Sequence, residues 1–544
     1  MVNREVFERA IDQMRDVVGQ EFVVTDGAEF EKISRATIPE PKHPSALVRP
    51  GSAQEVAEIV RISQNLGIGI WPVSRGKNWG YGSATPVLEN TAVVMLDRLN
   101  RILEIDEKLA YAVIEPGVTY RQLHQCLREQ HPELWCDTTD GPPDGSVIGN
   151  ALDRGVGVTH YSDHFGTLCG LEVVLPNGNL IRSGGGPPGC RTWHTHKWGV
   201  GPYVEGLFSQ SNFGIVTKAG VWLMPRPEKF ISFTFDLHDE RDLPRLVDEV
   251  RELSLRNILQ SASHIANDIV ALCVLSQYPP NLLQRYSRLP PDVLAELCSQ
   301  LGIHKWTFGG GIQGTSAQVR TVKRELRKRL GRMGRLLFVD DRIAAFAGKL
   351  ANVAKRPVIG KIVAPTVKAV SGRSIAMLEA APHIHSVLGG NPSDYFVRHA
   401  YFKSNLPKPE LSDPDRDNCG LIWFAPIAPM TGQHVDELLR ICSPLFEKHG
   451  FDFYVALLVQ NARSMIVLMS IFFRKEDNEQ VVQAKALYSA LSEAVFRAGF
   501  QQYRIGVNGM LRLRETSPDF VHFLHQIKMG VDPGDILAPG KYGI

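Results

Sequence analysis

The chain has 544 residues, of which 44% are hydrophobic and 22% charged, and its formal net charge is +2. This length exceeds what one hydrophobic core usually holds and predicts two or more domains. The near-neutral charge excludes a general attraction to nucleic acid or to an acidic membrane surface, and no apolar run reaches the roughly 20 residues that cross a bilayer.

Cysteines and histidines indicate neither a disulfide scaffold nor a metal site. The eight cysteines are scattered without CxxC spacing, which is typical of reduced thiols in an intracellular protein. Residues 1–13 carry charges where a secretory signal needs an apolar stretch, so we expect a cytoplasmic location. The pairs His194 with His196 and His383 with His385 have no evident third ligand, and we predict no metal site.

The first 224 residues alternate short strands and helices. A strand at 46–48 precedes a capping box, Ser52 to Glu55, which begins a helix that ends at Gly67. Further elements are predicted in chain order: strands at 68–73, 92–96 and 111–114, a helix at 119–129, a hairpin at 171–182 around Pro176-Asn177-Gly178, and a strand at 213–224.

The pattern changes after residue 227. Long helical stretches such as 316–330 and 479–498 are separated by proline-rich connections, which predicts a second α+β domain. Beyond about residue 500 short strands and turns return, and we expect this last segment to rejoin the first domain.

Three polar, glycine-rich segments are candidates for ligand binding. The loop "SRGKNWGYG" at 74–82 follows a strand, a second patch spans 144–157, and a third, at 208–217, is rich in hydroxyls and amides. Glycine permits positive φ and close backbone approach, so such loops can direct N–H groups at phosphate oxygens. The Walker pattern is absent, which disfavours an NTPase. Three patches fit a long ligand with central phosphates, such as a dinucleotide, although any one of them alone could be a plain turn.

A fourth glycine run, Gly184 to Gly189, fits GxGxxG formally. Pro187 and Pro188 remove N–H donors where a nucleotide-binding helix would begin. We therefore predict a loop there.

Several segments together resemble a known family. They are "PVSRGKNWGYG", "EPGVTY", "GSVIGNALDRGVG", "SDHFG", "CGLEVVLPNG", "FSQSNFGIVTKAG" and the terminal "LAPGKYG". The chain resembles the vanillyl-alcohol oxidase and 4-cresol dehydrogenase flavoproteins, and within them the eugenol oxidase-like members. The resemblance is dense from about residue 40 to 228 and returns at 415–430 and 500–544.

The resemblance implies an α+β fold that binds FAD. Residues 1–227 would form a PCMH-type FAD-binding domain of two subdomains, residues 228–500 a cap over the flavin, and residues 501–544 a segment returning to the first domain. The implied cofactor-binding residues are Ser74, Arg75, Gly76, Lys77, Asn78, Gly80, Gly145, Ser146, Gly149, Asn150, Gly155, Gly157, Gly214, Ile215, Val216 and Lys541.

The resemblance also implies a phenol site. Tyr81 matches the family tyrosine that binds a phenolic oxygen, and Tyr503 and Arg504 match the pair that completes this site. Two phenol donors and a guanidinium can stabilise a phenolate. Asp140 falls where relatives have an acid near the flavin, and it is the candidate base.

One position departs from the family pattern. Leu421 stands where oxidase-type relatives carry a histidine bonded to FAD. Because a leucine side chain cannot form that bond, we predict non-covalent FAD, with Tyr401 and Cys419 as alternative tethers. We place Val158, His160, Leu421 and Trp423 in the substrate pocket.

The resulting prediction is an FAD-dependent oxidoreductase that acts on a para-substituted phenol or related aromatic compound. Hydride would pass from the benzylic or allylic carbon to FAD, and O2 would reoxidise the flavin and give H2O2. The alternatives are a dehydrogenase that hands electrons to a cytochrome or similar acceptor, and a flavin-binding protein with a non-redox or cyclisation role. We expect a homodimer or a larger homo-oligomer.

Overall fold

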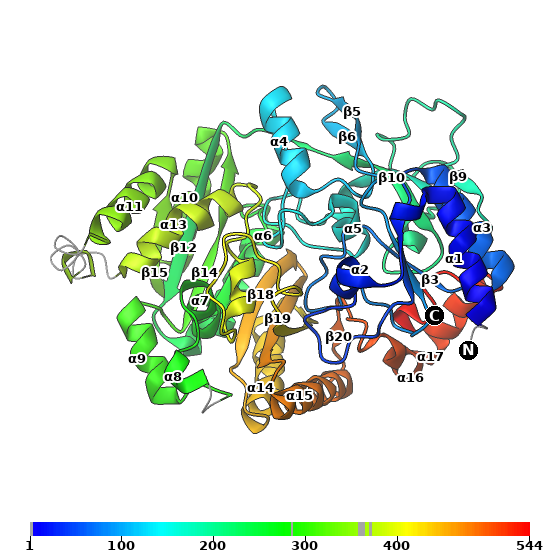
Figure 1. Ribbon diagram of the computed structural model, residues 1–544. Helices are drawn as coiled ribbons and strands as arrows, with labels where there is room; N and C mark the ends of the chain where they lie inside the picture. Colours follow the sequence, from blue (N-terminus) through cyan, green and yellow to red (C-terminus); the bar gives the residue numbers. More distant parts are fainter. Residues whose placement is uncertain (1–3, 284–286, 357–364, 369–372) are drawn as a thin grey trace.

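The computed structural model describes residues 4–283, 287–356, 365–368 and 373–544. In Figure 1 the green to orange ribbon of the middle of the chain forms one half of the molecule, and the blue, cyan and red ribbon of both chain ends forms the other. The chain folds into three main sheets. Among the described residues no helix combines the length and the apolar character that a bilayer crossing requires.

The first sheet has the strand order β1-β2-β4-β3. Its strands are β1 (Val23–Val24), β2 (Ala46–Val48), β4 (Ala92–Met95) and β3 (Ile70–Val73), and helices α1 (Arg4–Val18), α2 (Gly27–Ile33) and α3 (Ala53–Leu66) accompany them. Strand β4 pairs in parallel with both β2 and β3. Helix α3 begins at Ser52, whose side chain accepts a hydrogen bond from the Glu55 N–H, and ends at Gly67 with φ 66°, as the capping box predicts.

The second sheet is antiparallel, with the order β5-β6-β10-β8-β9. Its strands are β5 (Ile102–Asp106), β6 (Tyr111–Ile114), β10 (Ile215–Trp222), β8 (Leu168–Val174) and β9 (Leu180–Arg182). Helices α4 (Tyr120–Gln130) and α5 (Val147–Leu152) pack on it through one buried apolar cluster. The predicted hairpin is the β8–β9 pair, with Gly178 at φ 77° in its turn. A small sheet pairs β7 (Leu134–Trp135) with β11 (Met224–Pro225).

The third sheet, called the cap sheet below, has nine strands in the order β15-β12-β14-β13-β18-β19-β17-β20, with β16 also paired to β19. These strands are β12 (Lys229–Leu237), β13 (His264–Asn267), β14 (Trp306–Gly314), β15 (Gly334–Val339), β16 (Cys419–Phe424), β17 (Pro426–Pro429), β18 (Tyr454–Asn461), β19 (Ser464–Arg474) and β20 (Gln501–Gln502).

Helices cover the cap sheet through the largest buried apolar cluster. Those with residues in this cluster are α6 (Leu243–Leu255), α10 (Ser316–Leu330), α14 (Gly432–Lys448) and α15 (Asn478–Arg497). Further helices among the described residues of the middle region are α7 (Asp268–Leu275), α8 (Pro280–Leu283), α9 (Pro291–Leu301), α11 (Asp341–Ala354) and α13 (Ile375–Leu388).

The C-terminal segment connects two of the sheets. Strand β20 pairs with β17 of the cap sheet, and the chain continues through α16 (Leu513–Thr516) and α17 (Pro518–Val531). Leu537 then forms a parallel bridge with Ile70 of the first sheet. This path returns the chain to the half of the molecule that holds the N-terminus (Figure 1).

Candidate active site

A cavity of about 320 Å³ lies where the first sheet, helix α5 and the cap sheet meet. All but four of the predicted site residues line it: Ser74, Arg75, Gly76, Lys77, Asn78, Tyr81, Asp140, Gly145, Ser146, Gly149, Asn150, Gly155, Gly214, Ile215, Val216, Leu421, Trp423, Tyr503, Arg504 and Lys541. The four that do not line it are Gly80, Gly157, Val158 and His160.

The loop at 74–82 packs tightly against the cap. A Cβ on Gly80 would lie 1.7 Å from Cδ1 of Trp423, and the Gly80 carbonyl accepts a hydrogen bond from the Trp423 N–H at 3.1 Å. Gly80 also has φ 76°, which an L side chain rarely adopts. Gly80 therefore fixes the distance between this loop and Trp423 without lining the cavity.

The second glycine patch lies directly against the first. A Cβ on Gly149 would be 2.1 Å from Ser74 Oγ, and one on Gly155 would be 2.0 Å from Asn150 Oδ1. Ser146 begins α5 and accepts a hydrogen bond from the Gly149 N–H at 2.8 Å. The absence of side chains at the two glycines leaves backbone atoms and polar side chains at the cavity wall.

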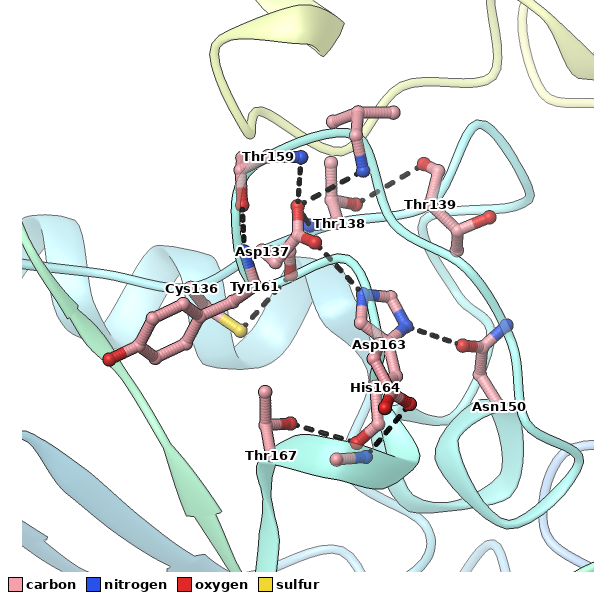
Figure 2. Close-up of polar contacts among 12 residues, drawn as sticks. Cys136, Asp137, Thr138, Thr139, Asn150, Thr159, Tyr161, Asp163, His164 and Thr167 are labelled. Carbon is pink, nitrogen blue, oxygen red and sulfur yellow. Dashed lines mark hydrogen bonds and ion pairs between the residues drawn. The ribbon is translucent and has the colours of Figure 1, made fainter. Parts of the chain in front are cut away.

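A buried network around Asp137 supports this wall (Figure 2). Asp137 Oδ1 accepts hydrogen bonds from the N–H groups of Thr138, Val158 and Thr159, and Oδ2 lies 3.2 Å from His164 Nε2. The other ring nitrogen of His164 lies 2.6 Å from Asn150 Oδ1. The network thus holds the side chain of Asn150, which lines the cavity, through its contact with His164.

Gly157, Val158 and His160, which we predicted as site residues, make their contacts outside the cavity. A Cβ on Gly157 would lie 1.8 Å from Asp137 Oδ2, so this glycine makes room for the carboxylate. Val158 packs its side chain on Val387 and Leu388. His160 is exposed and contacts Gln313 through Nδ1.

Tyr81, Tyr503 and Arg504 meet in the cavity. The guanidinium carbon of Arg504 lies 5.0 Å from the ring centroid of Tyr81 and 5.5 Å from that of Tyr503. Backbone hydrogen bonds fix this meeting, because the Val507 N–H donates to the Tyr81 carbonyl and the Tyr503 N–H to the Ala425 carbonyl, both at 2.9 Å.

Arg504 is oriented by two residues of the FAD-binding half. Its Nε and Nη2 donate to the Asp153 carbonyl at 3.1 and 2.9 Å, and its Nη1 donates to Asn78 Oδ1 at 3.2 Å. Burial raises the pKa of Tyr81 and of Tyr503, while the positive charge of Arg504 opposes both shifts. Both phenols therefore remain protonated hydrogen-bond donors at neutral pH.

Asp140 reaches the cavity from the loop after β7. Its carboxylate accepts a hydrogen bond from Thr139 Oγ1 at 3.3 Å. The Asp140 side chain keeps exposed surface because it faces the cavity. Burial by the surrounding protein raises the pKa of its carboxyl, and the charge of His264 opposes the rise. A raised pKa makes the carboxylate a stronger base, which suits a general base.

Comparison with known proteins identifies the family. Residues 44–184 match the FAD binding domain family. The chain is 36% identical to the 1'-carboxy-chondrochloren decarboxylase of Chondromyces crocatus over 99% of this chain and 98% of that protein. It is 29% identical to the flavoprotein subunit of 4-cresol dehydrogenase (hydroxylating) of Pseudomonas putida, over 100% of this chain and 96% of that one.

Comparison with solved structures also gives matches over the full length of the chain. Substrate-bound p-cresol methylhydroxylase (PCMH) superposes with a TM-score of 0.86 at 27% identity, and the isoeugenol complex of 4-ethylphenol oxidase from Gulosibacter chungangensis with 0.87 at 28%. Each match covers 100% of this chain and 98% of the other. The chain belongs to the PCMH-type family of FAD-binding proteins. It is an FAD-dependent oxidoreductase with the predicted α+β architecture, whereas closeness to eugenol oxidase-like members stays a prediction.

The cavity of this PCMH-type protein has a donor set that fits FAD. Its wall offers the backbone of the 74–78 loop, the start of α5 and the hydroxyl and amide groups of 210–214, with glycines where a Cβ would fill the space. Lys541 adds a buried ammonium 5.6 Å from the Trp71 ring centroid. These groups could hold the phosphates and the ring system of FAD.

Leu421, where we expect the flavin-bonding histidine of oxidase-type members, lies on the cavity side of β16. Leu421 and Trp423 line the cavity there, and Leu421 pairs with Phe472 of β19. Tyr401 does not line the cavity, and its hydroxyl donates to Asp417 Oδ2 at 2.6 Å. Cys419 is buried against a separate, smaller cavity. Neither alternative tether faces the FAD cavity.

Several residues that line the cavity were not singled out from the sequence, and three of them carry polar or titratable groups of interest: His399, Tyr120 and Tyr542. His399 lines the cavity, its ring lies 5.3 Å from that of Trp423 at 85°, and burial lowers its pKa to about 4. Tyr120 and Tyr542 also line the cavity, and the charge of Arg504 acts on the pKa of both. His399 lies within the short 3-10 helix Val397–Tyr401, in the region of thin resemblance, where no sequence signal singles it out. Tyr120 and Tyr542 lie in segments that carry the family resemblance.

Proposed function

We propose that the protein oxidises a para-substituted phenol, or a related aromatic compound, by hydride transfer from its benzylic or allylic carbon to FAD. The observation that carries this proposal is the convergence of Tyr81, Tyr503 and Arg504 on one cavity. Relatives that match over the full chain are named for 4-cresol and 4-ethylphenol, both of them para-substituted phenols.

Arg504 and the two tyrosines would bind the ionised phenol oxygen. The tyrosine hydroxyls can donate hydrogen bonds, and the guanidinium adds a full charge where bulk water is excluded. Each unit by which the phenol pKa falls corresponds to about 1.4 kcal/mol. The ionised oxygen pushes electron density toward the para carbon, so that hydride leaves and a quinone methide remains. FAD, when bound, would supply the hydride acceptor.

Asp140 would complete the reaction as the base. It would take the proton from a water that adds to the quinone methide, or from the hydroxyl of an alcohol substrate. Its carboxylate lines the same cavity as Tyr503, and its charge acts on the Tyr503 phenol.

We propose O2 as the electron acceptor, with H2O2 as the second product. A dehydrogenase that passes electrons to another protein is the alternative, and one relative is the flavoprotein subunit of such an enzyme by name. Mixing reduced protein with air distinguishes them, because an oxidase reoxidises within a turnover and forms stoichiometric peroxide. Slow reoxidation without peroxide would favour the dehydrogenase.

The decarboxylase relative supports a second candidate reaction, because its 36% identity spans nearly the whole of both chains. A phenol with a carboxylate beside the benzylic carbon could lose hydride first. The C–C bond to the carboxylate would then break, and its electron pair would form the side-chain double bond as the ring regains its phenolate. Release of one CO2 per reduced FAD, measured anaerobically, would identify this reaction.

The direct test of the proposal is anaerobic mixing with 4-methyl, 4-ethyl and 4-allyl phenols. We expect loss of the oxidised flavin absorbance with at least one of them. The matching phenol methyl ethers, which cannot ionise, should leave the flavin oxidised. If none of the three phenols reduces the flavin, the proposal is wrong.

A further inference from the structure

Asp137 and His164 form a buried pair behind the cavity wall (Figure 2). Asp137 is 7% and His164 5% exposed, and Asp137 Oδ2 lies 3.2 Å from His164 Nε2. A Cβ on Gly157 would lie 1.8 Å from Asp137 Oδ2 and 2.4 Å from His164 Nε2. The pair therefore depends on glycine at 157, and the close contact holds the imidazole ring in one orientation.

The hydrogen bonds of this pair determine where its hydrogens lie. Asp137 Oδ1 accepts three backbone N–H groups, at 2.8, 3.2 and 3.0 Å, so it carries no hydrogen itself. A hydrogen is needed between Asp137 Oδ2 and His164 Nε2, because two bare acceptor atoms would repel each other at this distance. The opposite ring nitrogen, Nδ1, faces Asn150.

His164 Nδ1 meets two polar groups of the cavity wall. It lies 2.6 Å from Asn150 Oδ1 and 3.0 Å from the Tyr120 hydroxyl, which itself donates to Asn150 Oδ1 at 3.1 Å. With a hydrogen on Nδ1, Oδ1 accepts from both groups and both of its lone pairs are used. With Nδ1 bare, the amide would have to be turned over, and its N–H would compete with the tyrosine O–H for one lone pair. A hydrogen on Nδ1 therefore satisfies this set of groups best.

This arrangement leaves the NH2 group of Asn150 for a ligand. Asn150 lines the cavity and is partly exposed, and its Nδ2 has no hydrogen-bond partner among the described residues. A Cβ on Gly155 would lie 2.0 Å from Oδ1 and 2.3 Å from Nδ2 of Asn150, so the amide can lie there only beside a glycine. The phosphate and flavin carbonyl oxygens of FAD are acceptors that suit such an N–H donor.

We propose that Asp137 and His164 are positioning residues that turn the NH2 group of Asn150 toward an acceptor oxygen of FAD. His164 Nδ1 donates to Asn150 Oδ1, and Asp137 holds the hydrogen on the opposite side of the ring. Neither Asp137 nor His164 lines the cavity, and both act through Asn150. The inference depends on FAD binding and not on the phenol chemistry proposed above.

The hydrogen on Nδ1 can be observed directly. In FAD-loaded protein with ring-labelled histidine, the nitrogen chemical shift distinguishes a protonated ring nitrogen from a bare one. We expect a protonated Nδ1 in His164 at pH 7. The resonance is assigned by its loss in His164→Gln or, if that variant does not fold, by its shift in Tyr120→Phe, which lacks the hydroxyl 3.0 Å away. A bare Nδ1 would overturn the proposal.

The role toward FAD is tested by a double-mutant cycle. His164→Gln should weaken FAD binding about 10-fold, as expected for one hydrogen bond, and Asn150→Ala should weaken it by a similar factor. Because His164 acts through Asn150, the double variant should bind FAD no more weakly than Asn150→Ala alone. Additive losses, or wild-type affinity in His164→Gln, would overturn the proposal. The control is His43→Gln, at an exposed histidine of the same half, which should bind FAD as wild type does.

The flavin midpoint potential shows which oxygen of FAD accepts the hydrogen bond. A contact to a phosphate holds oxidised and reduced FAD alike, so the potential of Asn150→Ala would equal that of wild type. A contact to a flavin carbonyl holds reduced FAD more tightly, because reduction adds electron density to the ring, and the potential of the variant would fall. A higher potential in Asn150→Ala fits neither contact and would overturn the donor role.

Discussion

Leu421 is the residue on which our prediction of non-covalent FAD depends. Its side chain offers only carbon and hydrogen to a flavin, and Tyr401 and Cys419 do not line the cavity. His399 does line it, next to Trp423. The mode of flavin attachment therefore depends on which nucleophile, if any, faces the flavin.

We predict that acid precipitation of the purified protein releases its FAD. The supernatant should be yellow and contain intact FAD by mass, because Leu421 forms no bond to the flavin. A yellow pellet would contradict this prediction. The flavin-bearing peptide would then identify the tether, and His399→Ala would test the nearest candidate.

Arg504 gives the second prediction at the residue scale. Arg504→Lys keeps the charge but loses the planar set of donors that contacts Asp153 and Asn78. Hydrogen bonds to a charged group contribute about 1.5–3 kcal/mol each, so phenol binding should weaken about 10- to 100-fold by flavin-perturbation titration. FAD content should stay unchanged. If Arg504→Lys binds the phenol with wild-type affinity, Arg504 is not part of the phenol site.

At the scale of elements, the loop at 74–83 is fastened to the segment before β16 by two aspartates. Asp413 Oδ2 pairs with the Lys77 ammonium at 3.0 Å. Asp415 accepts hydrogen bonds from Trp79 Nε1 at 3.0 Å and from Ser83 Oγ at 2.9 Å. Burial raises the pKa of Asp415 to about 7, the Ser83 hydroxyl opposes the rise and the Asp413 charge adds to it.

This fastening predicts a pH-dependent stability. A carboxyl with a higher pKa in the folded protein than in the unfolded chain stabilises the fold at low pH, and that contribution is lost as the pH rises through about 7. At pH 8 the cost of the buried charge is on the order of 4 kcal/mol. Asp415→Asn should therefore gain thermal stability relative to wild type between pH 5 and pH 8.

The control for this effect is Asp16→Asn on the exposed face of α1. Its melting temperature should follow that of wild type across the same pH range. A constant difference between Asp415→Asn and wild type would mean that Asp415 is already ionised at pH 5.

At the scale of the whole molecule, a buried lysine holds the C-terminal segment at the cavity. Lys528 is 0% exposed, pairs with Asp532 Oδ2 at 2.7 Å and donates to the carbonyls of Asn212 and Leu537 at 2.9 and 2.7 Å. Asn212 adjoins the cavity-lining Ser211, and Leu537 leads to Lys541. One ammonium thus connects two distant parts of the FAD site.

Removing this ammonium should affect both stability and FAD retention. Lys528→Met leaves the Asp532 carboxylate buried without its partner, which typically costs about 3–5 kcal/mol. The double variant Lys528→Met/Asp532→Asn should recover part of the loss. Denaturant unfolding and the FAD dissociation constant are the measurements, with the exposed Lys349→Met as control. If the Lys528→Met variant loses stability but binds FAD as tightly as wild type, Lys528 does not support the FAD site.

Local sequence signals predict several elements of this protein, because such signals are strong where they occur. The Ser52 cap, the Gly67 stop and the Asn177-Gly178 turn depend on neighbouring backbone geometry, and the structure has each of them as predicted. The loop at 184–189 is likewise free of helix and strand. The glycine-rich segments could be recognised since close backbone approach requires glycine whatever the rest of the fold.

Only the tertiary structure decided which distant residues meet. Tyr81 and Arg504 are separated by most of the chain, and their contact depends on how β20 and the C-terminal segment pack. His399 carries no local signature, because its place at the cavity depends on how distant segments pack around it. Long-range packing has no fixed spacing in the sequence. The sequence could therefore indicate the cofactor and the phenol site, whereas the residues that the cap contributes to the cavity could be identified only from the fold.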